Sequence, residues 1–136
     1  HGLVPVTFYP LNYKSVFSRN MHLFMEYDIR VIKVPSPENW LQAIQSADFV
    51  LTDSFHGTVF SLIFNTPFIS LINTKRGASR FLDLQKIFNI HNLFIDQRNA
   101  PFEVTHIPSD IDWVKINSLI RTMSDRSFSF LKGFNP

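Results

Sequence analysis

The chain has 136 residues, of which 45% are apolar and 18% are charged, with a formal net charge of +2. This composition is ordinary for a globular domain, and the length is enough to bury one hydrophobic core. No segment concentrates basic residues, so a nucleic-acid partner is not expected. We predict a single domain over residues 1–136.

The chain contains no cysteine. Disulfides, a thiolate metal site and a thiol nucleophile are therefore excluded. No apolar run approaches the ~20 residues that a membrane span needs, and nothing at the start has the pattern of a secretion signal. We expect a protein without a membrane span, located in the cytoplasm.

The aromatic residues are unevenly distributed among types, with fifteen Phe against three Tyr and two Trp. Such a surplus predicts large core side chains and a face that packs on something outside this chain, either a further domain or a second copy. The sequence begins with His1 and Gly2 directly before the strand-like segment LVPVTFY. We expect the chain to be cut from a longer protein.

Apolar runs in the first third predict a helix over Ser15–Tyr27 and a strand over Ile29–Val34. Ser36 is suited to be an N-cap and Pro37 to be the first helical residue. A helix is therefore predicted over Pro37–Ser46.

The middle of the chain has a strand, helix, strand pattern: Phe49–Leu51, Val59–Phe64 and Pro67–Ile72. Both strands are apolar at consecutive residues and the connection between them is short. This pattern favours an α/β fold with a parallel sheet buried on both faces and a right-handed crossover.

The second half of the chain continues the alternation of helices and strands. A basic loop, Asn73–Ala78, precedes a helix that is marked by Phe81, Leu84 and Phe88. The later elements predicted by pattern are a strand, Leu93–Ile95, and a helix from Ile111 to Met123 that continues to Gly133.

The turn after the first strand of this pattern carries five polar or small residues: Asp53, Ser54, His56, Gly57 and Thr58. Ligands of open α/β sheets bind at the carboxyl ends of the strands, and a helix start offers unpaired N–H groups to an anion. A capping role explains the same residues, with Asp53 or Ser54 as the cap and Gly57 allowing a close approach. Both interpretations stand at this point.

Other catalytic patterns receive little support. A Ser-His-Asp triad needs groups arranged around one another, which neighbours on one tight turn rarely achieve. The G-x-S-x-G, G-x-G-x-x-G and Walker patterns are all absent from the chain. A hydrolase, dinucleotide or P-loop site is therefore not predicted.

Lys75, Arg76 and Arg80 form a second polar cluster, which follows the next predicted strand. Parallel strands would bring this cluster to the same sheet edge as His56. Guanidinium groups suit carboxylate and phosphate, so the cluster can hold a small dianion. A solvated basic loop is the alternative interpretation.

Asp110-Ile111-Asp112 resembles the D-x-D of metal-dependent glycosyltransferases, but Ser109 lies three residues before Asp112 and favours a helix cap. The remaining histidines have no ligand spacing. We expect no metal site.

Three segments together resemble the polysaccharide pyruvyl transferase family: ADFVLTDSFHGTVFSLIFNTPFI, NTKRGASRF and RTMSDRSFSFL. The first is the specific one, because aspartate, serine and His-Gly lie between an apolar strand and a helix, followed by N-x-P-F-I. The resemblance spans most of residues 29–132. It implies a Rossmann-like, three-layer α/β/α fold and the C-terminal part of a two-domain GT-B-type enzyme that lacks its N-terminal domain here.

The resemblance implies transfer of the enolpyruvyl unit of phosphoenolpyruvate to a saccharide, forming a pyruvate ketal in bacterial exopolysaccharide or capsule synthesis. No cofactor is needed for this chemistry. His56 matches the family's catalytic histidine, while Gly57 and Thr58 would present helix-start amides to the donor. Several members have Arg-Leu before the His-Gly, where this chain has Ser54 and Phe55. In this chain, Arg76 or Arg80 would then supply the positive charge that the arginine provides in those members.

Two further classes of function remain open. The serine at position 54 favours a non-catalytic anion- or sugar-binding domain of the same fold, and the architecture is also that of GT-B glycosyltransferases. The sequence leaves open the acceptor sugar, whether that acceptor is lipid-linked and at the inner membrane face, and whether the protein forms a homo-oligomer.

Overall fold

The computed structural model describes residues 6–9, 30–33, 36–72, 77–96 and 107–133. The chain divides into two compact units, residues 1–43 and residues 44–136. The helix expected over Ser15–Tyr27 lies outside the described residues. A single domain over the whole chain stays a prediction.

The first unit contains two parallel strands, β1 (Val6–Tyr9) and β2 (Arg30–Lys33). Val6 lies opposite Arg30 at one end of the pair, and Tyr9 lies opposite Lys33 at the other. The strand β2 confirms the expected strand over Ile29–Val34.

The helix α2 (Pro37–Ser46) crosses the boundary between the two units and has the predicted bounds. The Asn39 N–H donates to Ser36 Oγ at 3.2 Å, which confirms Ser36 as the cap. Hydrogen bonds from its own backbone N–H and from the Ser36 side chain lower the pKa of the exposed Glu38 carboxyl. The start of this helix is therefore determined by local sequence.

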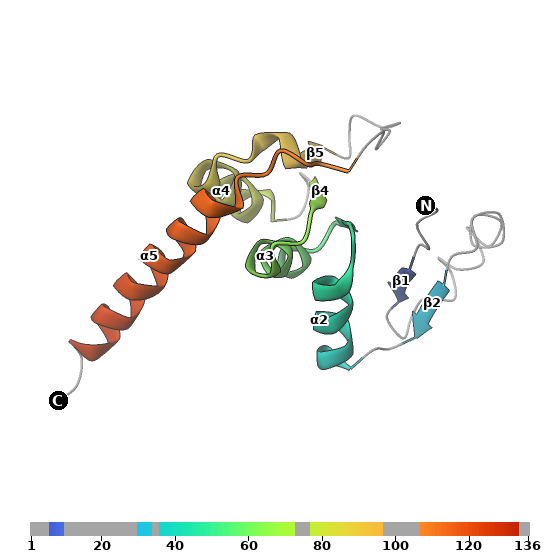
Figure 1. Ribbon diagram of the computed structural model, residues 1–136, viewed down its shortest axis with the longest axis horizontal. Coiled ribbons are helices and arrows are strands. Elements are labelled where there is room, and N and C mark those ends of the chain that lie inside the picture. The colour runs from blue at the N-terminus through green and yellow to red at the C-terminus, as the bar shows by residue number, and fades with distance from the viewer. Residues whose placement is uncertain (1–5, 10–29, 34–35, 73–76, 97–106, 134–136) are drawn as a thin grey trace. The chain divides into compact units, whose positions relative to one another are not determined.

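The second unit is built on a three-stranded parallel sheet in the order β3-β4-β5. Its elements, in chain order, are β3 (Val50–Thr52), α3 (Phe55–Phe64), β4 (Phe68–Ile72), α4 (Ala78–Phe88), the 3-10 turn η1 (His91–Leu93), β5 (Phe94–Asp96) and α5 (Trp113–Lys132). Figure 1 labels β4 and β5 of this sheet and the helices α3, α4 and α5 of the same unit. Thr52 lies opposite Ser70, and Ile72 lies opposite Asp96. The predicted α/β fold with a parallel sheet is confirmed, while the three-layer GT-B arrangement stays a prediction.

The two strands that were expected to be buried on both faces differ in burial. In β4, Phe68, Ile69 and Ser70 are all buried. In β3, the Leu51 side chain is 50% exposed, so the expectation is wrong for that strand. The two strands differ in burial because β3 is at the end of the described strand order, whereas β4 lies between two neighbouring strands.

Helix α3 begins at Phe55 rather than at the expected Val59. The residues read as a polar turn, from His56 to Thr58, already form its first turn, because Ser54 caps the helix just before them. The helix ends at Asn65, which takes the left-handed conformation with φ 58°. Asparagine tolerates this conformation better than most residues, which makes it a good helix terminator.

The core of the second unit is a cluster contributed by α3, β4, α4, α5 and the segment before β5. Its buried members are Leu62, Phe68, Phe88, Ile90, Leu93 and Ile116. These side chains fix the sheet against its helices, since burying large apolar side chains is the main favourable contribution to folding.

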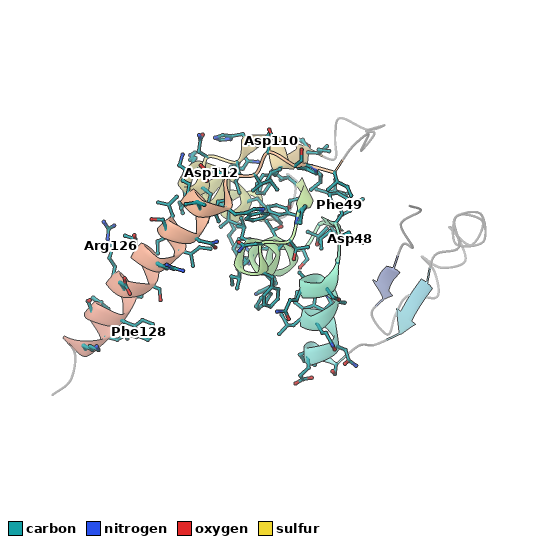
Figure 2. The ribbon with its side chains drawn as sticks, in the orientation of Figure 1. Asp48, Phe49, Asp110, Asp112, Arg126 and Phe128 are labelled. Carbon is teal, nitrogen blue, oxygen red and sulfur yellow. The ribbon has the colours of Figure 1, made fainter. Side chains whose placement is uncertain are left out.

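Helix α5 is capped by Asp112, whose Oδ1 accepts from the Lys115 N–H at 2.9 Å. The prediction that Ser109 caps this helix is therefore wrong, because the helix begins at Trp113, too far from Ser109 for a capping bond. From Arg121 onward the helix is exposed at every residue, and Figure 2 shows Arg126 and Phe128 on this exposed half. No helix in the described ranges has the length and apolar character to cross a membrane.

Candidate functional site

The candidate site lies where β3 passes into α3, at the carboxyl edge of the sheet. Ser54 has an extended backbone, with φ −88° and ψ 126°, and its Oγ accepts from the Gly57 N–H at 3.3 Å. The Ser54 carbonyl accepts from the Thr58 N–H at 3.0 Å. Ser54 therefore acts as the N-cap, the structural role that was weighed for it.

Thr52 and Gly57 bring the strand end and the helix start into close contact. Thr52 Oγ1 accepts from the Ser54 N–H at 3.1 Å. A Cβ added at Gly57 would lie 2.5 Å from the same Thr52 Oγ1, which is closer than real contacts allow. The glycine is thus required by the close approach of Thr52 and contributes no side-chain chemistry of its own.

Thr58 is fully buried and fastens α3 to β4. Its hydroxyl donates to the Ser54 carbonyl at 3.1 Å and lies 2.8 Å from Ser70 Oγ. Thr58 has one hydroxyl proton, so Ser70 is the donor between the two side chains. The Thr58 side chain is therefore occupied in structure, and its amide is occupied by Ser54.

The amides at the helix start are not equivalent. Those of Gly57 and Thr58 already donate to Ser54. Within the described residues, the amides of Phe55 and His56, at the first two helical positions, donate to no protein group. They also carry the positive end of the helix dipole. Among the described residues, the amides of Gly57 and Thr58 thus serve the helix cap, and their binding of an anion stays a prediction.

The His56 and Asp53 side chains are both exposed at this edge. An exposed imidazole on the first turn of a helix can exchange protons with a bound ligand or with water. The buried residues of the same helix turn hold the backbone that carries the imidazole ring. The turn thus combines an exposed imidazole with two amides that donate to no group among the described residues.

Arg80, from the first turn of α4, also reaches this edge. Its guanidinium carbon lies 4.9 Å from the centroid of the Phe55 ring. The Phe55 ring meets the His56 ring edge-on, with centroids 5.9 Å apart. The structure therefore places Arg80 and His56 in contact with the same aromatic ring, although they come from different helices.

Lys75 and Arg76, the other two members of the basic cluster, lie outside the described residues. From the sequence, Phe55 was named only as the residue that replaces leucine in the family's Arg-Leu pair, not as a site residue. A signal for it did exist, since it is an aromatic residue directly beside the histidine. Nothing in the sequence, however, indicated that it would contact Arg80.

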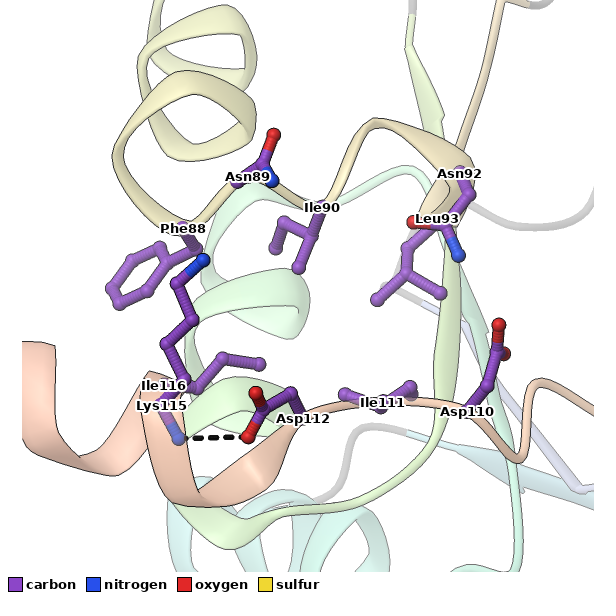
Figure 3. Close-up of a pocket in the computed structure, with 10 residues that line it drawn as sticks. All are labelled: Phe88, Asn89, Ile90, Asn92, Leu93, Asp110, Ile111, Asp112, Lys115 and Ile116. Carbon is purple, nitrogen blue, oxygen red and sulfur yellow. Dashed lines mark hydrogen bonds between the residues drawn. The ribbon is translucent and has the colours of Figure 1, made fainter.

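A separate cavity lies at the opposite edge of the sheet (Figure 3). Its volume is about 160 Å³, and it is lined by residues just before β5 and at the start of α5. Asp110 and Asp112 both line it, and Asp112 is already bound to the Lys115 amide. Because residues 88–93 precede β5, this cavity is at the amino end of that strand, away from His56.

A search of the described residues finds no group of three or more histidine and carboxylate side chains that could hold a metal ion. The D-x-D segment accordingly has a structural account there, with Asp112 as a helix cap.

These observations define an α/β protein whose parallel sheet carries a histidine, a pair of helix-start amides and an arginine at its carboxyl edge. Comparison with known protein families matches residues 7–75 to the polysaccharide pyruvyl transferase family. Since the match covers about half of the chain, the chain belongs to this family. The protein is thus a member of a transferase family whose name implies a saccharide acceptor.

The family match includes the whole turn from Thr52 to Thr58 and ends before Arg80. It begins earlier and stops sooner than the resemblance expected over residues 29–132. No curated protein matches the chain. No solved structure matches it either.

Proposed function

We propose that this protein transfers the enolpyruvyl unit of phosphoenolpyruvate to a saccharide, forming a pyruvate ketal in bacterial exopolysaccharide or capsule synthesis. Two sugar hydroxyls add to C2 of the donor, the C2–O bond to phosphate breaks, and C3 becomes a methyl group. One hydroxyl proton ends on C3 and the other leaves with phosphate. The reaction needs an acid/base group and cationic groups that hold a dianion.

The observation that carries this proposal is the position of Arg80 beside the first turn of α3. The guanidinium is stacked on Phe55, the residue that precedes His56. Phosphoenolpyruvate carries a carboxylate and a phosphate, and a guanidinium binds either one through paired hydrogen bonds. The amides of Phe55 and His56, which donate to no group among the described residues, would supply further donors at the helix start. In this assignment Arg80 compensates for the serine at position 54.

His56 is the acid/base residue in this proposal. An exposed imidazole next to the bound donor can accept the proton of an attacking hydroxyl and deliver a proton to C3. Asp53 lies exposed on the same turn and would accept hydrogen bonds from sugar hydroxyls. Lys75 and Arg76, which follow β4 in the sequence, are proposed as additional cationic groups for the donor.

Calorimetric titration with phosphoenolpyruvate tests the donor site. We expect saturable binding by the native chain, weaker binding by Arg80→Ala, and partial retention by Arg80→Lys, since an ammonium keeps the charge but not the fork. Lys86→Ala is the matched control, because Lys86 is a basic, exposed residue of the same helix. Equal binding by Arg80→Ala and Lys86→Ala would contradict the assignment.

The capping role of Ser54 supports a second candidate, a binding domain of the same fold without transfer activity. In that case, the serine in place of the family's arginine reflects the loss of transfer activity, while the anion-binding site is retained. A phosphate-release assay with phosphoenolpyruvate and a panel of saccharides separates the two functions. Binding without phosphate release from any acceptor favours the binding domain.

A further inference from the structure

Phe55 lies at the centre of the contacts that connect the groups of the candidate site. Its ring faces the Arg80 guanidinium carbon at 4.9 Å. It also meets two rings edge-on, that of His56 at 5.9 Å and that of Phe81 at 5.7 Å between centroids. The Phe55 side chain, which has no polar atom, therefore contacts the side chains of both Arg80 and His56.

The ring is itself anchored to the core. Phe81 is only 4% exposed, and its ring meets that of Phe94 on β5 with centroids 6.4 Å apart. A continuous series of aromatic contacts thus runs from the sheet to Phe55. Edge-to-face contacts of this kind are favourable, because the positive ring edge meets the negative ring face. Phe55 therefore offers a fixed surface to Arg80.

Arg80 needs such a surface because its side chain is exposed. A free arginine loses considerable rotamer entropy when it is held in one position. Stacking on an aromatic face supplies an attraction that offsets part of this loss before any ligand arrives. The N–H groups of a guanidinium lie along its planar edge, so stacking through its face leaves their donor directions unaffected.

Gly77 makes room for the same guanidinium. It precedes α4 in the left-handed conformation, with φ 66°, and a Cβ added there would lie 3.2 Å from Arg80 Nη2. That distance is tighter than nearly all real Cβ contacts. A side chain at this position would therefore press on the stacked Arg80, and glycine removes that obstacle.

We propose that Phe55 is a positioning residue that holds the Arg80 guanidinium beside the start of α3, ready to bind the carboxylate or phosphate of the donor. This inference rests on the proposed function, and it adds the means by which an arginine from a different helix serves the site. Ser54 is engaged as the cap of α3, so the cation has to come from elsewhere and to be held there. In this proposal, Phe55 keeps the Arg80 guanidinium in that position.

The test compares phosphoenolpyruvate affinity among four proteins: the native chain, Phe55→Leu, Phe55→Trp and Arg80→Ala. Leucine keeps an apolar residue of similar size at the helix start but has no π face, whereas tryptophan retains one. We expect Phe55→Leu to weaken binding by about two- to fivefold, the range of a single exposed cation–π contact, and Phe55→Trp to restore it.

The double variant Phe55→Leu/Arg80→Ala separates positioning from general damage to the fold. If Phe55 acts through Arg80, the leucine substitution has no further effect once Arg80 is removed. A leucine effect of the same size in both backgrounds would overturn the proposal. So would native affinity in Phe55→Leu.

A measurement without ligand distinguishes failure of this proposal from failure of the proposed function. A guanidinium over an aromatic face experiences a ring-current shift, which is observable at the Arg80 Nε–H signal in an NMR spectrum. We expect this signal to move downfield in Phe55→Leu. An unchanged signal would overturn the positioning role, whereas a shifted signal in a chain that does not bind phosphoenolpyruvate would contradict only the donor assignment.

Discussion

The hydroxyl oxygens of Thr58 and Ser70 lie 2.8 Å apart, and both side chains are fully buried. This hydrogen bond joins the first turn of α3 to the central strand β4, directly beneath the candidate site. The bond has no access to water. Its energetic value therefore depends on both partners being present.

We expect Thr58→Val to lower the free energy of unfolding by about 1–3 kcal/mol, because it leaves the Ser70 hydroxyl buried and unpaired. The double variant Thr58→Val/Ser70→Ala removes both polar groups and should lose less than the sum of the two single variants. Urea denaturation of the three variants measures this. Strict additivity would show that the two side chains are not coupled.

Gly57→Ala is expected to destabilise the protein by about 1–3 kcal/mol, the usual cost of overpacking. The new Cβ would lie 2.5 Å from Thr52 Oγ1 and displace the side chain that accepts from Ser54. Gly133→Ala is the control, since a Cβ there makes only ordinary contact, with Phe130 O at 3.4 Å. Equal unfolding midpoints for the two variants would refute this account.

Ser54→Ala should cost about 1 kcal/mol of stability through loss of the N-cap. Ser54→Asp keeps a capping oxygen and should stay close to the native stability. Thermal unfolding followed by circular dichroism compares them. The cap interpretation fails if alanine is as stable as aspartate at this position.

His56→Ala is expected to reduce turnover by about 10²- to 10⁴-fold, the usual contribution of an acid/base group. The side chain is exposed, so the unfolding temperature should hardly change. Phosphate release in the presence of phosphoenolpyruvate and an acceptor saccharide provides the measurement. His91→Ala, which removes another exposed histidine, serves as the control, and undiminished turnover by His56→Ala would exclude the residue from the mechanism.

Helix α5 offers a matched pair of apolar substitutions. Ile116 is 1% exposed and belongs to the core, whereas Val114, two residues earlier, is 83% exposed. Ile116→Ala should cost about 2–5 kcal/mol, and Val114→Ala should change stability by less than about 0.5 kcal/mol. Chemical denaturation of both variants tests whether helix α5 packs on the core through the face that carries Ile116.

Local sequence signals accounted for much of the fold. Ser36 and Pro37 predicted the start of α2 correctly, because capping involves only neighbours in the chain. The parallel sheet was predicted from the runs of consecutive apolar residues at β3 and β4, which are also patterns among neighbouring residues. The start of α3 was predicted four residues late, since a polar first turn has no apolar periodicity to mark it.

The candidate site was only partly visible in the sequence. Ser54 and Gly57 were recognised as residues of a tight turn, and the structure assigns both to capping and close packing. The contact of Phe55 with Arg80 was not visible, because the two residues belong to different helices. The exposure of Leu51 on β3, which ends the described strand order, was not visible either, because it depends on which elements pack on that strand.

By itself, the sequence determined the alternation of strands and helices, the bounds of α2 and the polar turn around His56, because these depend on neighbouring residues. Only the tertiary structure decided which strand is central, which amides of α3 remain free and which side chain holds Arg80. Those features depend on contacts between residues far apart in the chain. Their energies are set by burial and geometry that no local pattern records.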